Sequence, residues 1–427
     1  MRVRSLVLVT VAVALIASPA AVGATGRLGI PRADAPGEAS ADAIMDWSLI
    51  AQNSIVVVAK KFPGVGAGLM GVVHAAIYDA TVAIEGRFQP FAVAPEAPPN
   101  TSLEAAVATA AYGVLVGLFP DQQGSLDATY DAYLSSIPDG EAKDNGITLG
   151  EEVFEGILEL PAVAGLTAAP TPYEQPPPGP GVYEPTGPIV LGTNLPDVVP
   201  LVLESASQFR PDGPSALTSD EYADDFNEVK ALGRADSTDR TPEQTATALF
   251  WTDNDIAQWN RAMVRLADRE DLDATETARM LALAHVAGGD AMIACFDAKF
   301  HYNFWRPTQA IPRADTDGNP TTEPDPTWVP LRTTPPFPEY PSAHACHSGA
   351  VTTVLAAIFG NGQINFTLDS LVTGETRYYR HFGDAIREVN NARVWAGFHF
   401  RNSDVEGSTL GRRVARFVLE NAFQPVQ

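Results

Sequence analysis

The chain has 427 residues, of which 45% are hydrophobic and 8% aromatic, so it can bury a large core and is not an intrinsically disordered protein. Its formal net charge of -24 excludes a general nucleic-acid binder and a protein held electrostatically on anionic membranes. A solvated acidic surface is the simplest interpretation of that charge. Any local group of Lys and Arg therefore stands out.

The N-terminus has the pattern of an export signal. Arg2 and Arg4 precede an apolar run over Leu6–Ala17 that is too short to span a bilayer, and small residues follow it. We therefore predict a signal peptide over residues 1–24, a mature chain from Thr25 and an extracytoplasmic, secreted location. An uncleaved membrane anchor is the alternative. We expect no later stretch to be long and apolar enough to cross a membrane.

Most of the remaining chain predicts helices, because apolar residues recur at spacings of three and four. In the N-terminal part the predicted helices cover residues 46–61, 66–85, 102–119, 122–137 and 144–160. In the C-terminal part they cover residues 219–232, 241–268, 275–305, 342–359, 370–396 and 408–422. No convincing strand is found. The predicted class is all-α, with helix bundles and long Pro-rich loops.

Residues 161–215 interrupt the helical pattern. They are rich in Pro and Gly, which predicts a long irregular connection. Side chains such as Tyr173 and Tyr183 give it a surface to pack with, so we expect a covering loop; a tethered linker is the alternative. The predicted division is thus an N-terminal helical part over 25–160, this connection, and a C-terminal helical part over 216–427.

The last third of the chain carries an unusual group of cations and histidines. Lys299 and Arg306 are seven residues apart, two helical turns, so both side chains leave one face. Two cations on one face repel each other unless an anion lies between them. The apolar Phe300, Phe304 and Trp305 between them would strengthen such a contact. A surface Lys and Arg that snorkel into solvent are the alternative.

A second motif, Pro341-Ser342-Ala343-His344, predicts a helix start. Ser342 suits the N-cap position, and the free amides that follow it can bind a phosphate-like group. Ala343 contributes a backbone N–H and little bulk. His344 would lie on the first turn, where it could exchange a proton with a bound oxygen. A packed core histidine is the alternative.

A third motif contains Arg393 and His399. Their spacing would point them roughly 120° apart on an ideal helix, but Gly397 permits a break that lets them converge. Arg393 offers a planar fork for two oxygens of one anion, and His399 can bond to the central atom. Asp404 follows and is expected to hold the other ring nitrogen of His399. A surface arginine, a core histidine and a surface acid are the respective alternatives.

Neighbouring residues receive weaker assignments. His347 shares a helix face with His344 and is expected to support it or to pack. Glu339 is near in sequence, but we expect its side chain to face solvent. Cys295 and Cys346 flank the motifs, and both a disulfide and two buried free thiols stay open. The remaining histidines are interpreted as structural: His74, His285, His301 and His381.

Together the three motifs resemble the signature K-x6-R-P, P-S-G-H and S-R-x5-H, which vanadium-dependent haloperoxidases share with the type 2 phosphatidic acid phosphatase superfamily. The rest of the chain is similar to the exported bacterial haloperoxidase-like branch. Three departures are present: Ala343 replaces Gly, Ala392 replaces Ser, and the acid after His399 comes one residue later than in the phosphatases. The last departure weakens the phosphatase interpretation.

The resemblance implies vanadate as cofactor. Its equatorial oxygens would be held by Lys299, Arg306, Ser342, the amide of Ala343, and Arg393. The resemblance further implies that His344 is the acid–base residue. It makes His399 the vanadate ligand, or the phosphorylated nucleophile in a phosphatase.

The predicted function is a vanadate-dependent haloperoxidase that oxidises halide with hydrogen peroxide to hypohalous acid. An organic acceptor is a further candidate partner. Phe337 lies where chloroperoxidases of the family carry an aromatic residue and bromoperoxidases a histidine, which favours the chloroperoxidase-like side. The alternatives are a secreted, metal-free acid phosphatase with a phosphohistidine intermediate and a non-catalytic exported oxyanion-binding protein. We expect no nucleic acid partner, and no membrane partner after removal of the signal.

Overall fold

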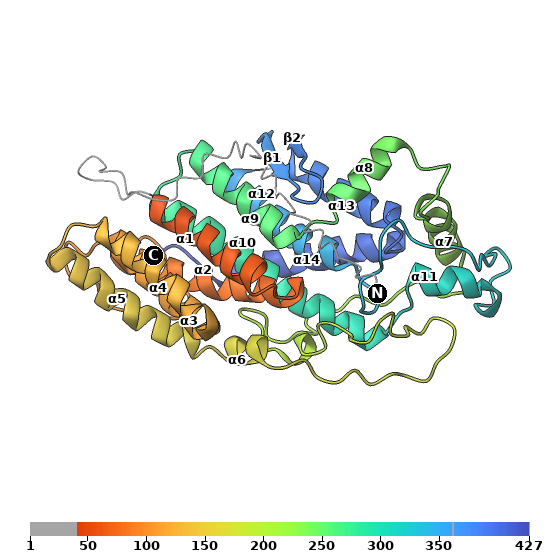
Figure 1. Ribbon diagram of the computed structural model, residues 1–427, viewed down its shortest axis with the longest axis horizontal. Helices are drawn as coiled ribbons and strands as arrows, with labels where there is room; N and C mark the ends of the chain where they lie inside the picture. The colour runs from red at the N-terminus through yellow and green to blue at the C-terminus, as the bar shows by residue number, and fades with distance from the viewer. Residues whose placement is uncertain (1–40, 361–362, 427) are drawn as a thin grey trace, which may run out of the picture.

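A computed structural model describes residues 41–360 and 363–426, which form helices and one short β-hairpin (Figure 1). The predicted all-α class is confirmed. The predicted signal peptide over 1–24 lies outside the described residues.

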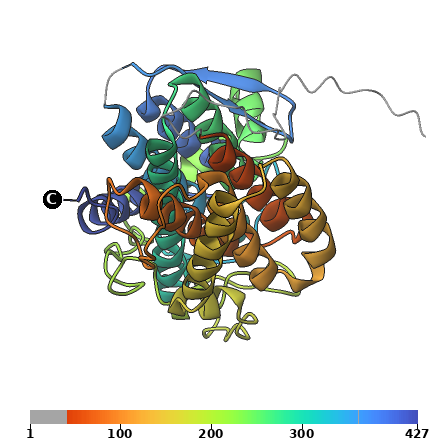
Figure 2. The ribbon, with the colours of Figure 1, turned by 90° about the vertical axis from the view of Figure 1, so that its left-hand side faces the viewer.

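The regular elements of the N-terminal part are helices, joined by an irregular segment over residues 86–102. These elements are α1 (Asp42–Gln52), a π-helical continuation (Asn53–Val58), α2 (Pro63–Glu85), α3 (Leu103–Leu118), a 3₁₀ turn (Pro120–Gln122), α4 (Gln123–Ser135) and α5 (Glu141–Leu158). Figure 1 shows α3, α4 and α5 at one end of the molecule, and Figure 2 views the molecule from that end. Ser102 begins α3 by accepting a hydrogen bond from the amide of Ala105, as an N-cap residue should.

The irregular connection contains only α6 (Pro161–Thr167) and a 3₁₀ turn (Leu195–Asp197). It is packed onto the protein. Asp290, buried on a central helix, accepts hydrogen bonds from the amides of three consecutive residues of the connection, Leu201, Val202 and Leu203. Tyr183 is fully buried. These contacts are those of a covering loop.

The C-terminal part contains the remaining elements. They are α7 (Asp220–Leu232), α8 (Pro242–Phe250), α9 (Asp255–Arg269), α10 (Ala274–Tyr302), α11 (Pro307–Ala310), a 3₁₀ segment (Ile311–Thr316), α12 (Ala343–Phe359), β1 (Phe366–Asp369), β2 (Thr376–Tyr379), α13 (Phe382–Trp395) and α14 (Arg401–Asn421). The two strands pair antiparallel, with Phe366 opposite Tyr379.

Three sequence predictions were wrong in this part. The helix predicted over 241–268 is two helices, because Asn254 caps a new helix start after a turn at Trp251. The helix predicted over 370–396 begins only at Phe382, since the preceding residues form the hairpin. The last helix begins at Arg401 rather than at residue 408.

The central helix α10 packs against α2, α12 and α14. Glycines permit the closest of these contacts. A Cβ placed at Gly407 of α14 would lie 2.6 Å from the carbonyl oxygen of Ser342, and one at Gly411 would lie 2.1 Å from that of Cys346. Because only glycine allows this approach, α14 lies directly against the first turns of α12. The contact brings the second and third motifs of the sequence side by side.

We expect Gly411→Ala to destabilise the protein. The added methyl meets main-chain atoms of α12, which cannot move without displacing the helix, so the free energy of unfolding should fall by about 1–3 kcal/mol. The matched control is Gly124→Ala in α4, where a Cβ meets nothing within 4 Å; it should stabilise the protein by up to about 1 kcal/mol. Urea unfolding of both variants measures the difference, and a neutral Gly411→Ala would contradict the packing argument.

Two described helices, α2 and α10, are long and apolar enough to cross a membrane by length and composition, so the expectation that no later stretch qualifies was wrong. In this fold, however, 89% of the apolar window of α2 and 94% of that of α10 are buried among other parts of the protein. A third candidate, α3 followed by α4, is bent by 117°. The apolar length of α2 and α10 serves the core.

Two histidines lie in that core. His74 of α2 and His285 of α10 stack with ring centroids 4.4 Å apart. His74 Nε2 is 3.1 Å from the Ser48 hydroxyl, and His285 Nε2 is 2.8 Å from Asn260 Oδ1. Burial lowers the pKa of His74 to about 3, so the folded state holds this ring neutral.

This burial predicts a specific loss of stability in acid. Below its ordinary pKa of 6.5 the unfolded chain protonates His74 while the folded protein does not until about pH 3. The contribution of His74 to the free energy of unfolding is therefore fully present above pH 6.5. It decreases as the pH falls, by about 1.4 kcal/mol per pH unit, or roughly 2 kcal/mol by pH 5. His74→Gln, which does not titrate, should lose that much less between pH 7 and pH 5 in urea unfolding. Equal pH dependence of the two proteins would contradict the prediction.

Candidate active site

The three sequence motifs meet where α10, α12, α13 and α14 come together. Lys299 is on the last turn of α10, and Arg306 follows the end of that helix. His344 is on the first turn of α12. Arg393 is on the last turn of α13, and His399 lies in the turn before α14. Gly397, at φ 79°, makes the predicted break that allows these last two residues to converge.

Arg306 and His399 are in direct contact. Arg306 is fully buried, and its Nη1 lies 3.2 Å from His399 Nε2 and donates to the carbonyl of Phe398. Its Nε donates to the carbonyl of Phe337, over whose ring the guanidinium lies at 4.8 Å. Its Nη2 is buried without a partner. One donor of this arginine is thus left over for a ligand.

Arg393 and Ser342 have the same property. Arg393 donates from Nη1 to the carbonyl of Trp251 at 2.6 Å, but its Nε is buried and unpartnered. The Ser342 hydroxyl, at the N-cap of α12, does not cap its own helix. It makes no hydrogen bond of ordinary geometry, and it lies near Asp404, where it opposes the rise in the carboxyl pKa that burial causes. Ala343 begins the helix and keeps its amide at the positive end of the helix dipole. Buried donors are normally satisfied, so this set fits a bound tetrahedral oxyanion such as vanadate.

Lys299 is placed differently from the other cations. Its Nζ donates to the main-chain carbonyls of Pro338 at 3.1 Å, Glu339 at 2.9 Å and Pro341. An ammonium has three donors, so in this structure all of them hold the loop before α12. Burial, followed by the nearby Arg306, lowers the pKa of Lys299 to about 8. The lysine lies beside the site and brings its charge, but its N–H groups are committed to the loop.

Glu339 is the residue that sequence reasoning missed. The expectation that it faces solvent was wrong: its side chain is fully buried, and its Oε1 lies 2.8 Å from Nδ1 of His399. Asp404, predicted to hold that nitrogen, is buried and interacts instead with the Ser342 hydroxyl and the charge of Arg393. The available signal was a carboxylate inside the otherwise uncharged run Pro335–Tyr340, where a charge would need a partner.

His344 lines a cavity of about 470 Å³ together with Arg393 and Phe398. The half-buried ring lies with Nε2 at 3.4 Å from the carbonyl of Asp253. Because a carbonyl only accepts, this contact places the proton on Nε2 and leaves the lone pair on Nδ1. Burial and then the charge of Arg393 lower the pKa of His344 to about 4, so the ring is neutral at neutral pH and can accept a proton.

His347 does not contact His344 directly. Its Nδ1 lies 3.1 Å from Asp255 Oδ2, and both side chains are 1% exposed. Burial alone would raise the pKa of Asp255, but His344 and His347 together lower it to about 2. The carboxylate is therefore a buried negative charge that contacts His347 and lies near His344.

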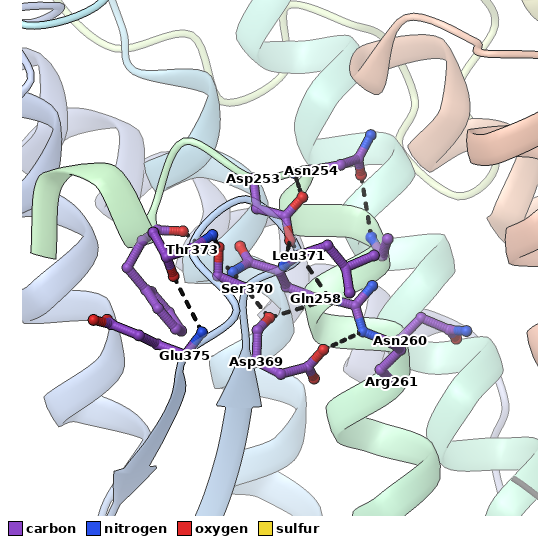
Figure 3. Close-up of polar contacts among 12 residues, drawn as sticks. Asp253, Asn254, Gln258, Asn260, Arg261, Asp369, Ser370, Leu371, Thr373 and Glu375 are labelled. Atoms are coloured by element: carbon purple, nitrogen blue, oxygen red, sulfur yellow. Dashed lines mark hydrogen bonds and ion pairs between the residues drawn. The ribbon is translucent and has the colours of Figure 1, made fainter. Parts of the chain in front are cut away.

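The β-hairpin was also absent from the predictions. Figure 3 shows its polar contacts with the segment around Asp253 and Arg261. Asp253 Oδ2 accepts from the amide of Leu371 at 2.8 Å, and Arg261 pairs with Asp369 at 2.7 Å. The carbonyl of the same Asp253 faces His344, and Val372 lines the cavity. The hairpin thus fixes the segment that holds the His344 ring.

The two cysteines are buried free thiols. Cys295 contacts the carbonyl of Pro341 at 3.7 Å and lies next to Cys346, directly behind the start of α12. Of the two alternatives left open by the sequence, this structure contains the thiols.

Comparison with known proteins agrees with this geometry. Residues 279–427 match the family model described as the VCPO second helical-bundle domain. A vanadium chloroperoxidase from Curvularia inaequalis is 26% identical over 89% of this chain and 82% of its own length. The C-terminal part of the chain, residues 279–427, thus matches a vanadium haloperoxidase family model, and most of the chain is similar to a member of that family. The matched region contains every motif of the oxyanion site, from Lys299 to His399.

Solved structures of the family share the fold. The first bacterial vanadium-dependent iodoperoxidase superimposes with a TM-score of 0.76 at 24% identity, over 92% of this chain and 99% of that one. A holo-type bacterial vanadium-dependent chloroperoxidase gives 0.67 at 17% identity, over 88% and 92%. Both halves of the chain, and not only the matched C-terminal region, therefore follow the vanadium haloperoxidase architecture.

Proposed function

We propose that this chain is a vanadate-dependent haloperoxidase that oxidises halide with hydrogen peroxide to hypohalous acid. The observation that carries the proposal is a set of buried donors without hydrogen-bond partners near His399. Each of the three motifs contributes one of them: Arg306 Nη2, Ser342 Oγ and Arg393 Nε. The similarity to a fungal vanadium chloroperoxidase supports the same reaction class.

Some residues of the site would bind the oxyanion, and His344 would transfer protons. His399 would ligate vanadate through Nε2, while the three unpartnered donors and the amide of Ala343 would neutralise its oxygens. When bound, the group activates hydrogen peroxide toward attack by a halide. Phe337 and Phe398 cover the cations and exclude water, which strengthens each charge contact.

His344 would handle the proton of the incoming peroxide. Its Nδ1 carries the lone pair, because Nε2 faces the carbonyl of Asp253, and its low pKa keeps it unprotonated before substrate arrives. The buried Asp255 carboxylate nearby would stabilise the imidazolium that forms. Lys299 would contribute its positive charge and hold the loop from Pro338 to Pro341 in place.

The decisive experiment loads the purified protein with orthovanadate and measures bound vanadium by elemental analysis. Bromide oxidation with hydrogen peroxide is then assayed, with and without vanadate. We expect tight stoichiometric vanadium and halide oxidation that depends on it. Hydrolysis of a phosphate monoester that vanadate inhibits, with no halide oxidation, would instead select a phosphohistidine phosphatase. Vanadium binding without either activity would select an oxyanion-binding protein.

We also propose that the mature protein works outside the cytoplasm. The support is the charged N-terminus and the short apolar run that follows it. Expression of the full chain in a bacterial host, followed by N-terminal sequencing of the exported protein, should give a start near Thr25. A cytoplasmic protein that keeps its first residues would overturn this part of the proposal.

A further inference from the structure

Both carboxyl oxygens of Glu339 make hydrogen bonds to the segment that contains His399. Its Oε1 lies 2.8 Å from His399 Nδ1 and accepts from the amide of Phe400 at 3.0 Å. Its Oε2 accepts from the hydroxyl of Ser403 at 2.6 Å. The carboxylate therefore bonds to His399 and to the first residues around the start of α14.

We infer that Glu339 is the positioning residue of His399, fixing both its tautomer and its ring orientation toward the oxyanion. The inference rests on the proposed function only for what the histidine is positioned to do. Glu339 itself touches no ligand, since it lies on the opposite side of the ring from Nε2.

The tautomer follows from the chemistry of the two partners. Glu339 Oε1 already accepts from the amide of Phe400, so the same oxygen also accepts from His399 and places the proton on Nδ1. A guanidinium only donates, so the contact with Arg306 requires the lone pair on Nε2. Both neighbours thus select the same form of the ring. That form keeps a lone pair on Nε2, which accepts from Arg306 Nη1 in this structure and which the central atom of an oxyanion would take in its place.

The orientation follows from where Glu339 is anchored. Its main-chain carbonyl accepts from Lys299 of α10, and its amide donates to the carbonyl of Phe304. A parallel tie runs from the amide of Ser342 to the carbonyl of Ser403. These hydrogen bonds join the loop before α12 to the start of α14. The carboxyl group of Glu339 is held by its main chain and by the partners of both oxygens, and it therefore orients the plane of the His399 ring.

The test uses two substitutions at one position. Glu339→Gln keeps an oxygen that can accept from both His399 and Phe400, while its amide can donate to the Ser403 hydroxyl, so position is preserved and charge is removed. Glu339→Ala removes every contact. Loss of such a supporting partner typically weakens metal affinity 10- to 100-fold.

The first readout needs no vanadate. In the full-length protein labelled with ¹⁵N-histidine, NMR reports which ring nitrogen of His399 carries the proton, and His399→Ala identifies its signals. Wild type and Glu339→Gln should show the proton on Nδ1, and Glu339→Ala should gain the form protonated on Nε2. A ring in Glu339→Ala that keeps the wild-type tautomer would overturn the inference.

The second readout is the dissociation constant of orthovanadate, measured by equilibrium dialysis. We expect Glu339→Gln within about threefold of wild type and Glu339→Ala weaker by about 10- to 100-fold. Equal affinities in Glu339→Ala and wild type, or equal losses in both variants, would contradict positioning. If the wild type binds no vanadate, the proposed function fails, while the NMR spectra still decide the role of Glu339.

A buried carboxylate far from the site provides the matched control. Asp79 of α2 also accepts hydrogen bonds from main-chain amides, those of Phe91, Ala92 and Val93, and is fully buried. Asp79→Asn should change thermal stability without changing the His399 tautomer or the vanadate affinity of the folded protein. A change in either would show that general loosening of the fold explains the Glu339 variants.

Discussion

Substitution of His399 by alanine is expected to abolish both vanadate binding and halide oxidation. The ring supplies the ligand atom of the proposed site, with Nε2 beside Arg306 and Nδ1 held by Glu339. The remaining donors can attract an anion but cannot ligate vanadium. Elemental analysis after dialysis should find no retained vanadium, and the rate with bromide and peroxide should fall to background.

The variant needs a control for folding, because removal of the ring leaves Glu339 with one partner fewer. An unsatisfied buried acceptor costs about 1–3 kcal/mol. His301→Ala, which removes an exposed ring near the end of α10, is the matched control and should keep both vanadium and activity. Vanadium retained by a folded His399→Ala protein would remove the proposed ligand.

Substitution of His344 by alanine should separate catalysis from binding. His344 lines the cavity but makes no contact with Arg306 or His399 that would hold the oxyanion. We expect turnover to fall by about 10²–10⁴, the usual contribution of a general acid–base residue, while vanadate affinity changes only a few-fold. Steady-state kinetics and equilibrium dialysis on the same preparation measure the two effects.

The pH profile supplies a second check on His344. Its pKa in the folded protein is about 4, below the ordinary 6.5, so the free protein keeps a proton acceptor at every pH above that value. Activity limited by this ring should decline as the pH falls toward 4 in wild type, and the acidic limb should disappear in His344→Ala. An unchanged limb, or loss of vanadium together with activity, would assign the residue to holding rather than to proton transfer.

Local sequence was sufficient for much of this site. Helix starts and ends depend on nearby residues, so the helix start after Ser342 and the break at Gly397 could be predicted and are present, although the Ser342 hydroxyl does not cap the helix. The two-turn spacing predicted for Lys299 and Arg306 was wrong, because α10 ends at Tyr302 and Arg306 reaches the site from the segment after the helix. The hairpin was missed because its two strands pair across a turn, and each strand alone is only four residues long.

The choice between Glu339 and Asp404 shows where local reasoning ends. Asp404 follows His399 by five residues and was the natural candidate, yet the partner of Nδ1 is 60 residues away along the chain. In the same way, the spacing of the motif predicted that Lys299 binds an anion. It could not show that the lysine ammonium donates to three main-chain carbonyls of the loop before α12.

The sequence by itself determined the helical class, the residue types of the oxyanion site and the turns that present them, because these depend on side-chain chemistry and on backbone preferences over a few residues. Only the tertiary structure decided which carboxylate orients His399, which donors remain free and what lines the entrance. Those outcomes depend on how closely α12 and α14 approach each other at Gly407 and Gly411. The sequence contains many chemically equivalent donors and acceptors, and only the long-range packing of the helices decides which of them meet.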